Sequence, residues 1–164
     1  MINLREIFNK RIASVDASNY RLIYKNEFAY NKSYSIGYDF GAIKRLERYE
    51  KGIVSSLYIC FGLKNPNADG DFYKQYFDSN FLNQGISEIA QEGARNHGLL
   101  NIAVGDFLDL DIPFPPLEEQ IRIAEVLTTL DTELEGLRGQ LQRVKTQKKG
   151  LMQQLLTGKT RVKG

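Results

Sequence analysis

The sequence predicts an α+β fold, in which a mixed α/β globular domain is followed by one long C-terminal coiled-coil helix. Three prolines within four residues, Pro113, Pro115 and Pro116, cannot continue a helix and impose an extended connection. Before them, apolar and polar runs alternate between glycines, whereas after them apolar residues recur with a heptad period. The expected parts are a globular domain over residues 1–111, a proline linker over 112–116, a coiled-coil helix over 117–158 and a basic tail over 159–164.

The segment before the prolines has the composition of a small mixed domain, rich in Tyr, Phe and Ile and broken by glycines such as Gly37, Gly41 and Gly52. Short alternating runs favour strands, and apolar residues spaced along one side favour short helices. The expected strands cover residues 21–25, 27–32 and 53–61, and the expected helices cover residues 71–82 and 87–94.

The segment after the prolines predicts a single helix from Leu117 to Leu156, with its stop at Gly158. With Leu127 at heptad position a, nine of the eleven a and d positions from Gln120 to Leu155 are apolar. A narrow apolar seam kept over this length is typical of a coiled coil, because an ordinary surface helix carries a broader stripe. The residues expected to pack against a second helix are Ile123, Leu127, Leu130, Leu134, Leu137, Leu141, Val144, Leu151 and Leu155.

The charges of this helix are segregated, with acidic residues in the first half and basic residues in the second. An antiparallel homodimer places acid against base, for example Asp131 opposite Arg138 or Lys145, whereas a parallel dimer keeps only Glu133 with Arg138. We therefore favour the antiparallel arrangement. The parallel dimer and a lone helix folded back on its own domain remain as alternatives.

Composition excludes several classes of protein. The net charge of +2 is too small to indicate a nucleic-acid partner, so any DNA affinity must come from a local patch. The single cysteine, Cys60, lies in an apolar run and favours a buried thiol in a reducing cytoplasm, where we expect the protein to reside. No apolar stretch approaches the roughly 18 residues of a membrane span, so no membrane partner is expected.

No catalytic or cofactor motif is visible in the chain. It contains no Gly-x-x-x-x-Gly-Lys-Ser/Thr loop for ATP and no Asn/Asp-Pro-Pro-aromatic motif for methyl transfer. With one histidine, His97, and one cysteine, a metal site cannot be assembled from these ligands. We therefore expect no cofactor, and a nuclease or other enzyme is the weakest of the alternatives.

Several motifs resemble those of specificity subunits of type I restriction-modification systems. The strongest is Ile112-Pro-Phe-Pro-Pro-Leu-Glu-Glu-Gln-Ile-Arg-Ile-Ala-Glu-Val-Leu127 followed by Leu130-Asp131, which resembles the region after a target-recognition domain. The run Leu151-Met-Gln-Gln-Leu-Leu-Thr-Gly158 resembles the close of that region. Residues 27–32 and 49–61 resemble core strands of one recognition-domain subgroup, with Ser56 where the family pattern has proline.

This resemblance implies a non-catalytic subunit that recognises double-stranded DNA, while methylation and cleavage belong to a methyltransferase (modification) subunit and an endonuclease (restriction) subunit. Family members usually carry two recognition domains and two antiparallel spacer helices, whereas this chain has one of each. It therefore resembles a half-subunit that rebuilds the two-domain arrangement as a homodimer on an inverted-repeat target. The alternative is a coiled-coil protein that docks on modification subunits without reading DNA sequence.

Two stretches are candidates for DNA contact because they combine cations, amides and aromatic side chains between glycines. The first lies between Tyr30 and Lys51, and the second is the Arg95-Asn96-His97 segment. A solvated loop or a phosphate contact is the plainer interpretation of any single residue in these stretches, and His97 is expected to be a surface histidine. The candidate DNA-binding residues are Asn31, Lys32, Tyr34, Lys44, Arg45, Arg48, Lys51, Arg95 and Asn96.

Overall fold

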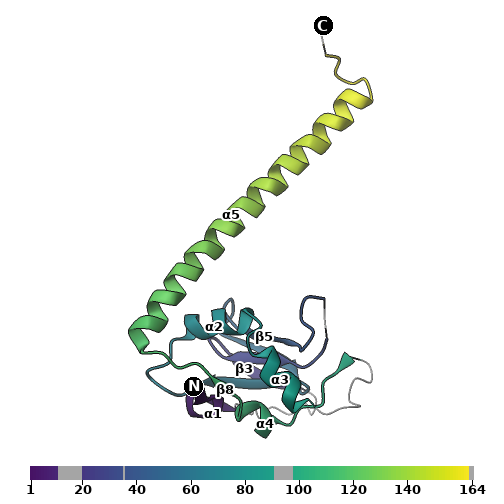
Figure 1. Cartoon of the computed structure of the whole chain (residues 1–164). Helices are drawn as coiled ribbons and strands as arrows, with labels where there is room; N and C mark the ends of the chain where they lie inside the picture. The colour runs from purple at the N-terminus through teal and green to yellow at the C-terminus, as the bar shows by residue number, and fades with distance from the viewer. Residues whose placement is uncertain (11–19, 35, 91–97, 163–164) are drawn as a thin grey trace. The chain divides into compact units, whose positions relative to one another are not determined.

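The computed structural model describes residues 1–10, 20–34, 36–90 and 98–162. Their contacts divide the chain into two compact units, residues 1–124 and residues 125–164. The elements in chain order are β1 (Ile2–Asn3), α1 (Leu4–Ile7), β2 (Phe8–Lys10), β3 (Tyr20–Tyr24), β4 (Phe28–Asn31), β5 (Ala42–Arg45), β6 (Lys51–Ser55), β7 (Ile59–Leu63), α2 (Gly70–Asp78), α3 (Asn83–Ile89), α4 (Val104–Leu108), β8 (Asp111–Ile112) and α5 (Leu117–Leu156) (Figure 1).

The first unit is built around an antiparallel four-stranded sheet with the strand order β2-β7-β4-β5. The neighbouring strands β3 and β6 form a separate two-stranded ribbon, in which Leu22 pairs with Ile53. A short pairing of β1 with β8 joins Ile2 to Ile112 and so ties the start of the chain to the residues before the prolines. Mixed helices and antiparallel strands followed by a long helix confirm the predicted fold class.

Both faces of the four-stranded sheet are covered, but unequally. On one face, helices α1 to α4 and the start of α5 bury an aromatic core around Phe8, Phe28, Phe61, Tyr73 and Phe77. The rings of Phe8 and Phe61 meet edge to face at 5.2 Å between centroids, a favoured arrangement for aromatic pairs. On the other face, a smaller cluster forms where the ribbon packs on the sheet.

The smaller cluster contains Ile23 of the ribbon with Ala29 and Cys60 of the sheet. The predicted burial of Cys60 is confirmed, since only 1% of the residue is exposed. Burial raises the pKa of its thiol, because the charged thiolate loses solvation there. The cysteine therefore acts as a small apolar residue between sheet and ribbon.

Three sequence-based boundaries need correction. The single strand expected over residues 53–61 is two strands, β6 and β7, because Ser55 accepts a hydrogen bond from the backbone N–H of Tyr58 and reverses the chain. The helix expected over 71–82 ends at Asp78, and the helix expected over 87–94 covers Asn83–Ile89, with residues 91–94 outside the described part. Strands β1, β2, β5 and β8 and helices α1 and α4 lie outside the predicted elements.

The long helix α5 runs without a break from Leu117 to Leu156, as predicted. After it, Gly158 takes a φ of +72°, the left-handed conformation that commonly ends a helix and that glycine adopts at least cost. Among the described residues, none of the helices combines the length and the apolar character needed to cross a membrane.

Candidate nucleic-acid interface

The end of β4 is joined to the segment that precedes α4. The backbone N–H of Tyr34 donates to the carbonyl of Gly98 at 2.7 Å, and the N–H of Leu100 donates to the carbonyl of Lys32 at 2.9 Å. The structure thus brings the first candidate stretch next to the residues that directly follow the second. Arg95, Asn96 and His97 themselves lie outside the described residues.

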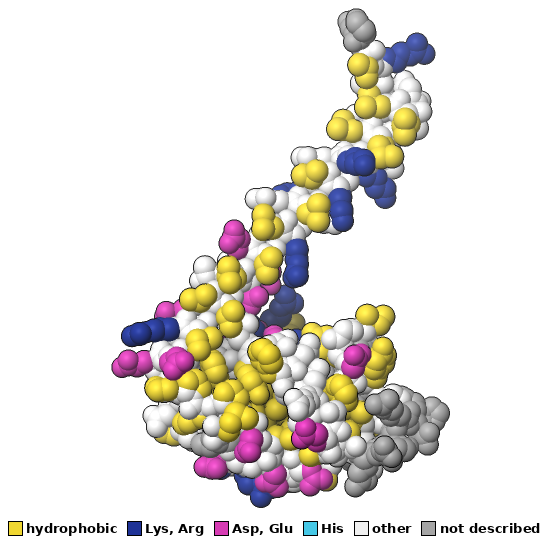
Figure 2. Space-filling view, viewed as in Figure 1, with side chains coloured by type: hydrophobic (Ala, Val, Ile, Leu, Met, Phe, Trp, Pro, Cys, Tyr) yellow, Lys and Arg dark blue, Asp and Glu magenta, His cyan; other side chains and the backbone are white. Residues whose placement is uncertain are grey.

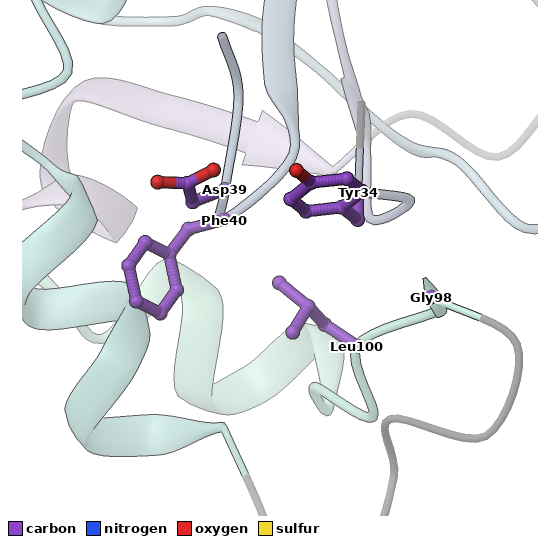
Figure 3. Close-up of a pocket in the computed structure, with 5 residues that line it drawn as sticks. All are labelled: Tyr34, Asp39, Phe40, Gly98 and Leu100. Atoms are coloured by element: carbon purple, nitrogen blue, oxygen red, sulfur yellow. The ribbon is translucent and has the colours of Figure 1, made fainter. Parts of the chain in front are cut away.

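A pocket of about 480 Å³ opens at this junction (Figure 3). Tyr34, Asp39 and Phe40 line it from the segment after β4, and Gly98 and Leu100 line it from the segment before α4. Tyr34 is 59% exposed, whereas Leu100 forms a buried wall. The pocket therefore offers an aromatic ring and a carboxylate above an apolar surface.

Gly41 and Asn31 fix the backbone beside this pocket. Gly41 has a φ of +81°, and a Cβ atom there would lie 2.2 Å from the carbonyl oxygen of Asn31. The side-chain carbonyl of Asn31 accepts a hydrogen bond from the backbone N–H of Ser33 at 3.0 Å. The glycine at position 41 therefore permits a close approach of two backbone segments.

Lys32 lies near Arg21 of β3. The pKa of Lys32 is lowered, first by partial burial and then by the positive charge of Arg21. The Nε of Arg21 donates to the carbonyl of Ser56 at 3.2 Å, which holds the guanidinium in place. Neither cation forms an ion pair within the described residues, so the two like charges raise the local positive potential.

Lys44 and Arg45 are engaged in ion pairs. The ammonium of Lys44 lies 2.5 Å from the carboxylate of Asp78. The guanidinium of Arg45 contacts Glu47 at 2.8 Å and Asp71 at 2.5 Å, and only 11% of its side chain is exposed. The structure thus places Arg45 between β5 and α2, not on an open surface, and its Nε is buried without a hydrogen-bond partner.

Arg48 and Lys51 lie on the surface before and at the start of β6. Both are exposed, and neither forms an ion pair in the described part of the chain. Of the candidate cations that the structure describes, Lys32, Arg48 and Lys51 therefore keep charges that an anionic ligand could reach.

The outer face of the β3–β6 ribbon is exposed and is not among the sites that the sequence predicts. Tyr20 is 54% exposed, Tyr24 is 53% exposed and Ile53 is 69% exposed. The alternation that predicted strands here also predicts two faces. The sequence pattern does not indicate which of the two faces the rest of the domain covers, so it does not predict which side chains are exposed.

The first two turns of α5 belong to the globular unit. Gln120, assigned to the coiled-coil seam by its heptad position, is instead fully buried against the domain. Its side-chain amide donates to the carbonyls of Asn67 at 3.1 Å and Pro115 at 2.8 Å. Ala124 is buried and Ile123 packs partly against the same core, so the exposed apolar row begins at Leu127.

Beyond Ala124, the apolar seam of α5 is exposed along its length. Leu127 is 38% exposed, Leu141 is 55% and Val144 is 60%. Figure 2 shows apolar side chains along the helix, with most of its acidic side chains in the first half and most of its basic ones in the second. A shallow apolar groove of about 350 Å³ near the C-terminal end is lined by Val144, Lys148, Leu151, Met152 and Leu155, among others.

Comparison with known proteins identifies the family. Residues 4–146 match the model of the type I restriction modification DNA specificity domain. The chain belongs to this family. The chain is 32% identical over 108 residues to the type I restriction enzyme MjaVIII specificity subunit of Methanocaldococcus jannaschii, covering 66% of this chain and 24% of that protein. It is 45% identical over 93 residues to the putative MjaX specificity subunit of the same organism, covering 57% of this chain and 21% of that protein.

The specificity-domain family is defined by DNA specificity and not by a reaction, in agreement with the expectation of a non-catalytic subunit. The matched segments correspond to only about a quarter or less of the length of these two relatives. Within the described residues, no group of three or more His, Cys, Asp or Glu side chains is arranged to hold a metal ion.

Proposed function

We propose that this chain is the DNA sequence-recognition subunit of a type I restriction-modification system. The observation that carries this proposal is the match of residues 4–146 to a DNA specificity domain. Its partners are double-stranded DNA, a methyltransferase (modification) subunit and an endonuclease (restriction) subunit, and the chain itself requires no cofactor. In this proposal residues 1–111 recognise the target, 112–116 are a linker, and 117–158 separate and pair the recognition domains.

DNA binding by the globular unit is supported by cations that form no ion pair within the described residues and could therefore bind phosphate groups. Lys32 and Arg21 stand close together as like charges, and a phosphate between them would relieve their repulsion. Arg48 and Lys51 add two exposed cations before and at the start of β6. Asn31, Tyr34 and the residues Arg95 and Asn96 remain candidates for base contact, whereas Lys44 and Arg45 have structural partners.

Pairing of two copies through α5 is supported by the exposed apolar row. In the antiparallel register that overlaps the whole seam, Leu127 faces Leu151 of the second copy and Leu137 faces Leu141. Leu134 faces Val144, and the twofold axis lies at Gly139. Burial of these half-exposed side chains supplies the stability, and Asp131 opposite Lys145 favours the antiparallel direction.

Two measurements on the purified full chain test the proposal. Sedimentation over a range of concentrations should show a dimer, and a chain that stays monomeric at high concentration contradicts the pairing. Selection of bound duplexes from a random pool should yield an inverted repeat with an unread spacer. A dimer that selects no sequence favours the alternative function, docking on modification subunits without reading DNA.

A further inference from the structure

Backbone hydrogen bonds of the residues that follow β3 hold the β3–β6 ribbon in place beside the four-stranded sheet. The N–H of Lys25 donates to the carbonyl of Glu50 at 3.0 Å, and the N–H of Asn26 donates to the carbonyl of Leu46 at 2.8 Å. The buried carboxylate of Glu27 accepts from the backbone N–H of Tyr24 at 2.9 Å. The ribbon is therefore a preorganised element, and a ligand on it would not have to order a loop.

The two faces of the ribbon have different surroundings. Ile23 points inward and is buried with Ala29 and Cys60. The opposite face carries Tyr20, Tyr24 and Ile53, all more than half exposed. Apolar and aromatic side chains grouped on one exposed face commonly mark an interaction surface.

The charges beside this face indicate an anionic partner. Lys51 pairs in the ladder with Tyr24, and Arg48 precedes it on the same connection. The acidic neighbour Glu50 is paired with Lys25 at 2.6 Å, so its charge is already balanced. The positive charge that remains, on Lys51 and Arg48, complements a polyanion such as duplex DNA. It would not be complemented by an apolar groove of a partner protein that lacks acidic residues.

We propose that the β3–β6 ribbon enters a groove of duplex DNA and reads base edges through its outer face. The major groove accepts a two-stranded ribbon, and thymine presents its methyl group there to apolar side chains. Ile53 is the candidate for that contact, Tyr20 and Tyr24 flank it with hydroxyl groups, and Lys51 with Arg48 binds the adjacent phosphates. This inference rests on the proposed function and names the residues that determine specificity within it.

The test uses the full chain and the duplex that the unaltered chain selects from a random pool. Ile53→Ser and Tyr24→Ala should each weaken binding to that duplex by about ten-fold, while binding to a scrambled duplex changes little. Lys51→Ala should weaken both and reduce the salt dependence by about one counterion. Phe81→Ala is the matched control, since Phe81 is also exposed, at 76%, but lies outside the ribbon.

A direct measurement supplements the affinities. With 5-iodouracil in place of each thymine in the selected duplex, ultraviolet cross-links should join the base to Tyr20 or Tyr24, identified by mass spectrometry. Because the three altered side chains are exposed, thermal unfolding of each variant should match the unaltered chain, which separates loss of contact from loss of fold.

The outcomes distinguish this inference from the proposed function. An unaltered chain with no sequence preference overturns both. An unaltered chain with a preference that Ile53→Ser and Tyr24→Ala retain in full overturns the ribbon assignment alone. If those variants read DNA normally but no longer co-purify with the methyltransferase subunit, the ribbon is a protein-docking face and the inference is wrong.

Discussion

The side-chain carbonyl of Gln120 accepts a hydrogen bond of 2.8 Å from the backbone N–H of Asp69, 51 positions away in the sequence. The carboxylate of Asp69 in turn caps α2 through the N–H of Phe72 at 2.7 Å. One glutamine therefore joins the start of the long helix to the start of a helix in the domain. This contact, together with the burial of Ala124, holds the first turns of α5 in the domain.

Replacing Gln120 by alanine should destabilise the globular unit by about 2–4 kcal/mol, because the N–H of Asp69 and two backbone carbonyls lose their buried partner. Urea unfolding followed by far-ultraviolet circular dichroism measures the change. Gln140→Ala is the matched control, since Gln140 is exposed on the same helix and its replacement should change stability by less than about 0.5 kcal/mol. Equal effects of the two substitutions would show that the hydrogen bonds of Gln120 do not stabilise the globular unit.

Gly41→Ala should lower the stability of the domain by at least about 2 kcal/mol. A left-handed alanine costs roughly 1–2 kcal/mol, and its Cβ would also collide with the carbonyl oxygen of Asn31 at 2.2 Å. Gly105→Ala provides the comparison, because Gly105 lies in helix α4 with nothing within 4 Å of the new Cβ. That substitution should be neutral or stabilise by about 0.5–1 kcal/mol, measured by thermal unfolding.

The long helix could be predicted from sequence because its signal is repeated over 40 residues and needs no knowledge of the rest of the fold. The part played by Gln120 could not, since its heptad position assigns it to the seam. Only the fold places Asn67 and Asp69 beside it. A polar residue in a seam position has two explanations, and the period alone does not choose between them.

The DNA-contact candidates show the same limit. The position of Lys44 and Arg45 near glycines and aromatic residues predicts phosphate binding, but Asp78 and Asp71, from another part of the chain, form ion pairs with them. The predicted strand over residues 21–25 includes Tyr24 but not Tyr20, and it does not indicate that either tyrosine lies on an exposed surface. Which face of a two-stranded ribbon is covered depends on how it folds over the sheet, a long-range relationship absent from local alternation.

The ion pairs around Glu47 predict a dependence of stability on pH. The hydrogen bond from Arg45, followed by that from Lys74, lowers the pKa of Glu47 in the folded chain below its ordinary value of 4.5. A lowered folded pKa contributes stability above the ordinary value, and this contribution is lost as the pH falls through the folded pKa. Because the Glu47 side chain is 45% exposed, the contribution is at most about 1 kcal/mol.

Glu47→Gln should therefore be less stable than the unaltered chain at pH 7, and the difference should disappear toward pH 3. Urea unfolding at pH 7, 4.5 and 3 follows it. Glu118→Gln, at a carboxylate that is 89% exposed, is the control for removing a negative charge in general. A difference that stays constant with pH would show that the ion pairs contribute nothing to folding.

Deleting one heptad, residues 134–140, tests whether α5 sets the distance between two recognition domains. The deletion keeps the seam in phase and shortens the helix by about 10 Å, the rise of roughly three base pairs. Binding-site selection should return the same half-sites with a changed spacer. An unchanged spacer would show that the length of α5 does not set the distance between the two half-sites.

Exchanging charges on α5 tests the direction of pairing. In the antiparallel dimer the pair between Asp131 of one copy and Lys145 of the other occurs twice, once on each side of the twofold axis. Asp131→Lys or Lys145→Asp alone should therefore weaken the dimer by about 2- to 30-fold, because two exposed pairs of about 0.2–1 kcal/mol each are lost. The double exchange should restore the dissociation constant, measured by sedimentation equilibrium at low salt. In a parallel dimer Asp131 would face the uncharged Val126 instead, so neither the loss nor the rescue should occur.

Glu133→Lys distinguishes the two directions of pairing, because Glu133 faces Arg138 only in the parallel arrangement. A dimer that is weakened by Glu133→Lys but not by Asp131→Lys would show that the two helices pair in parallel.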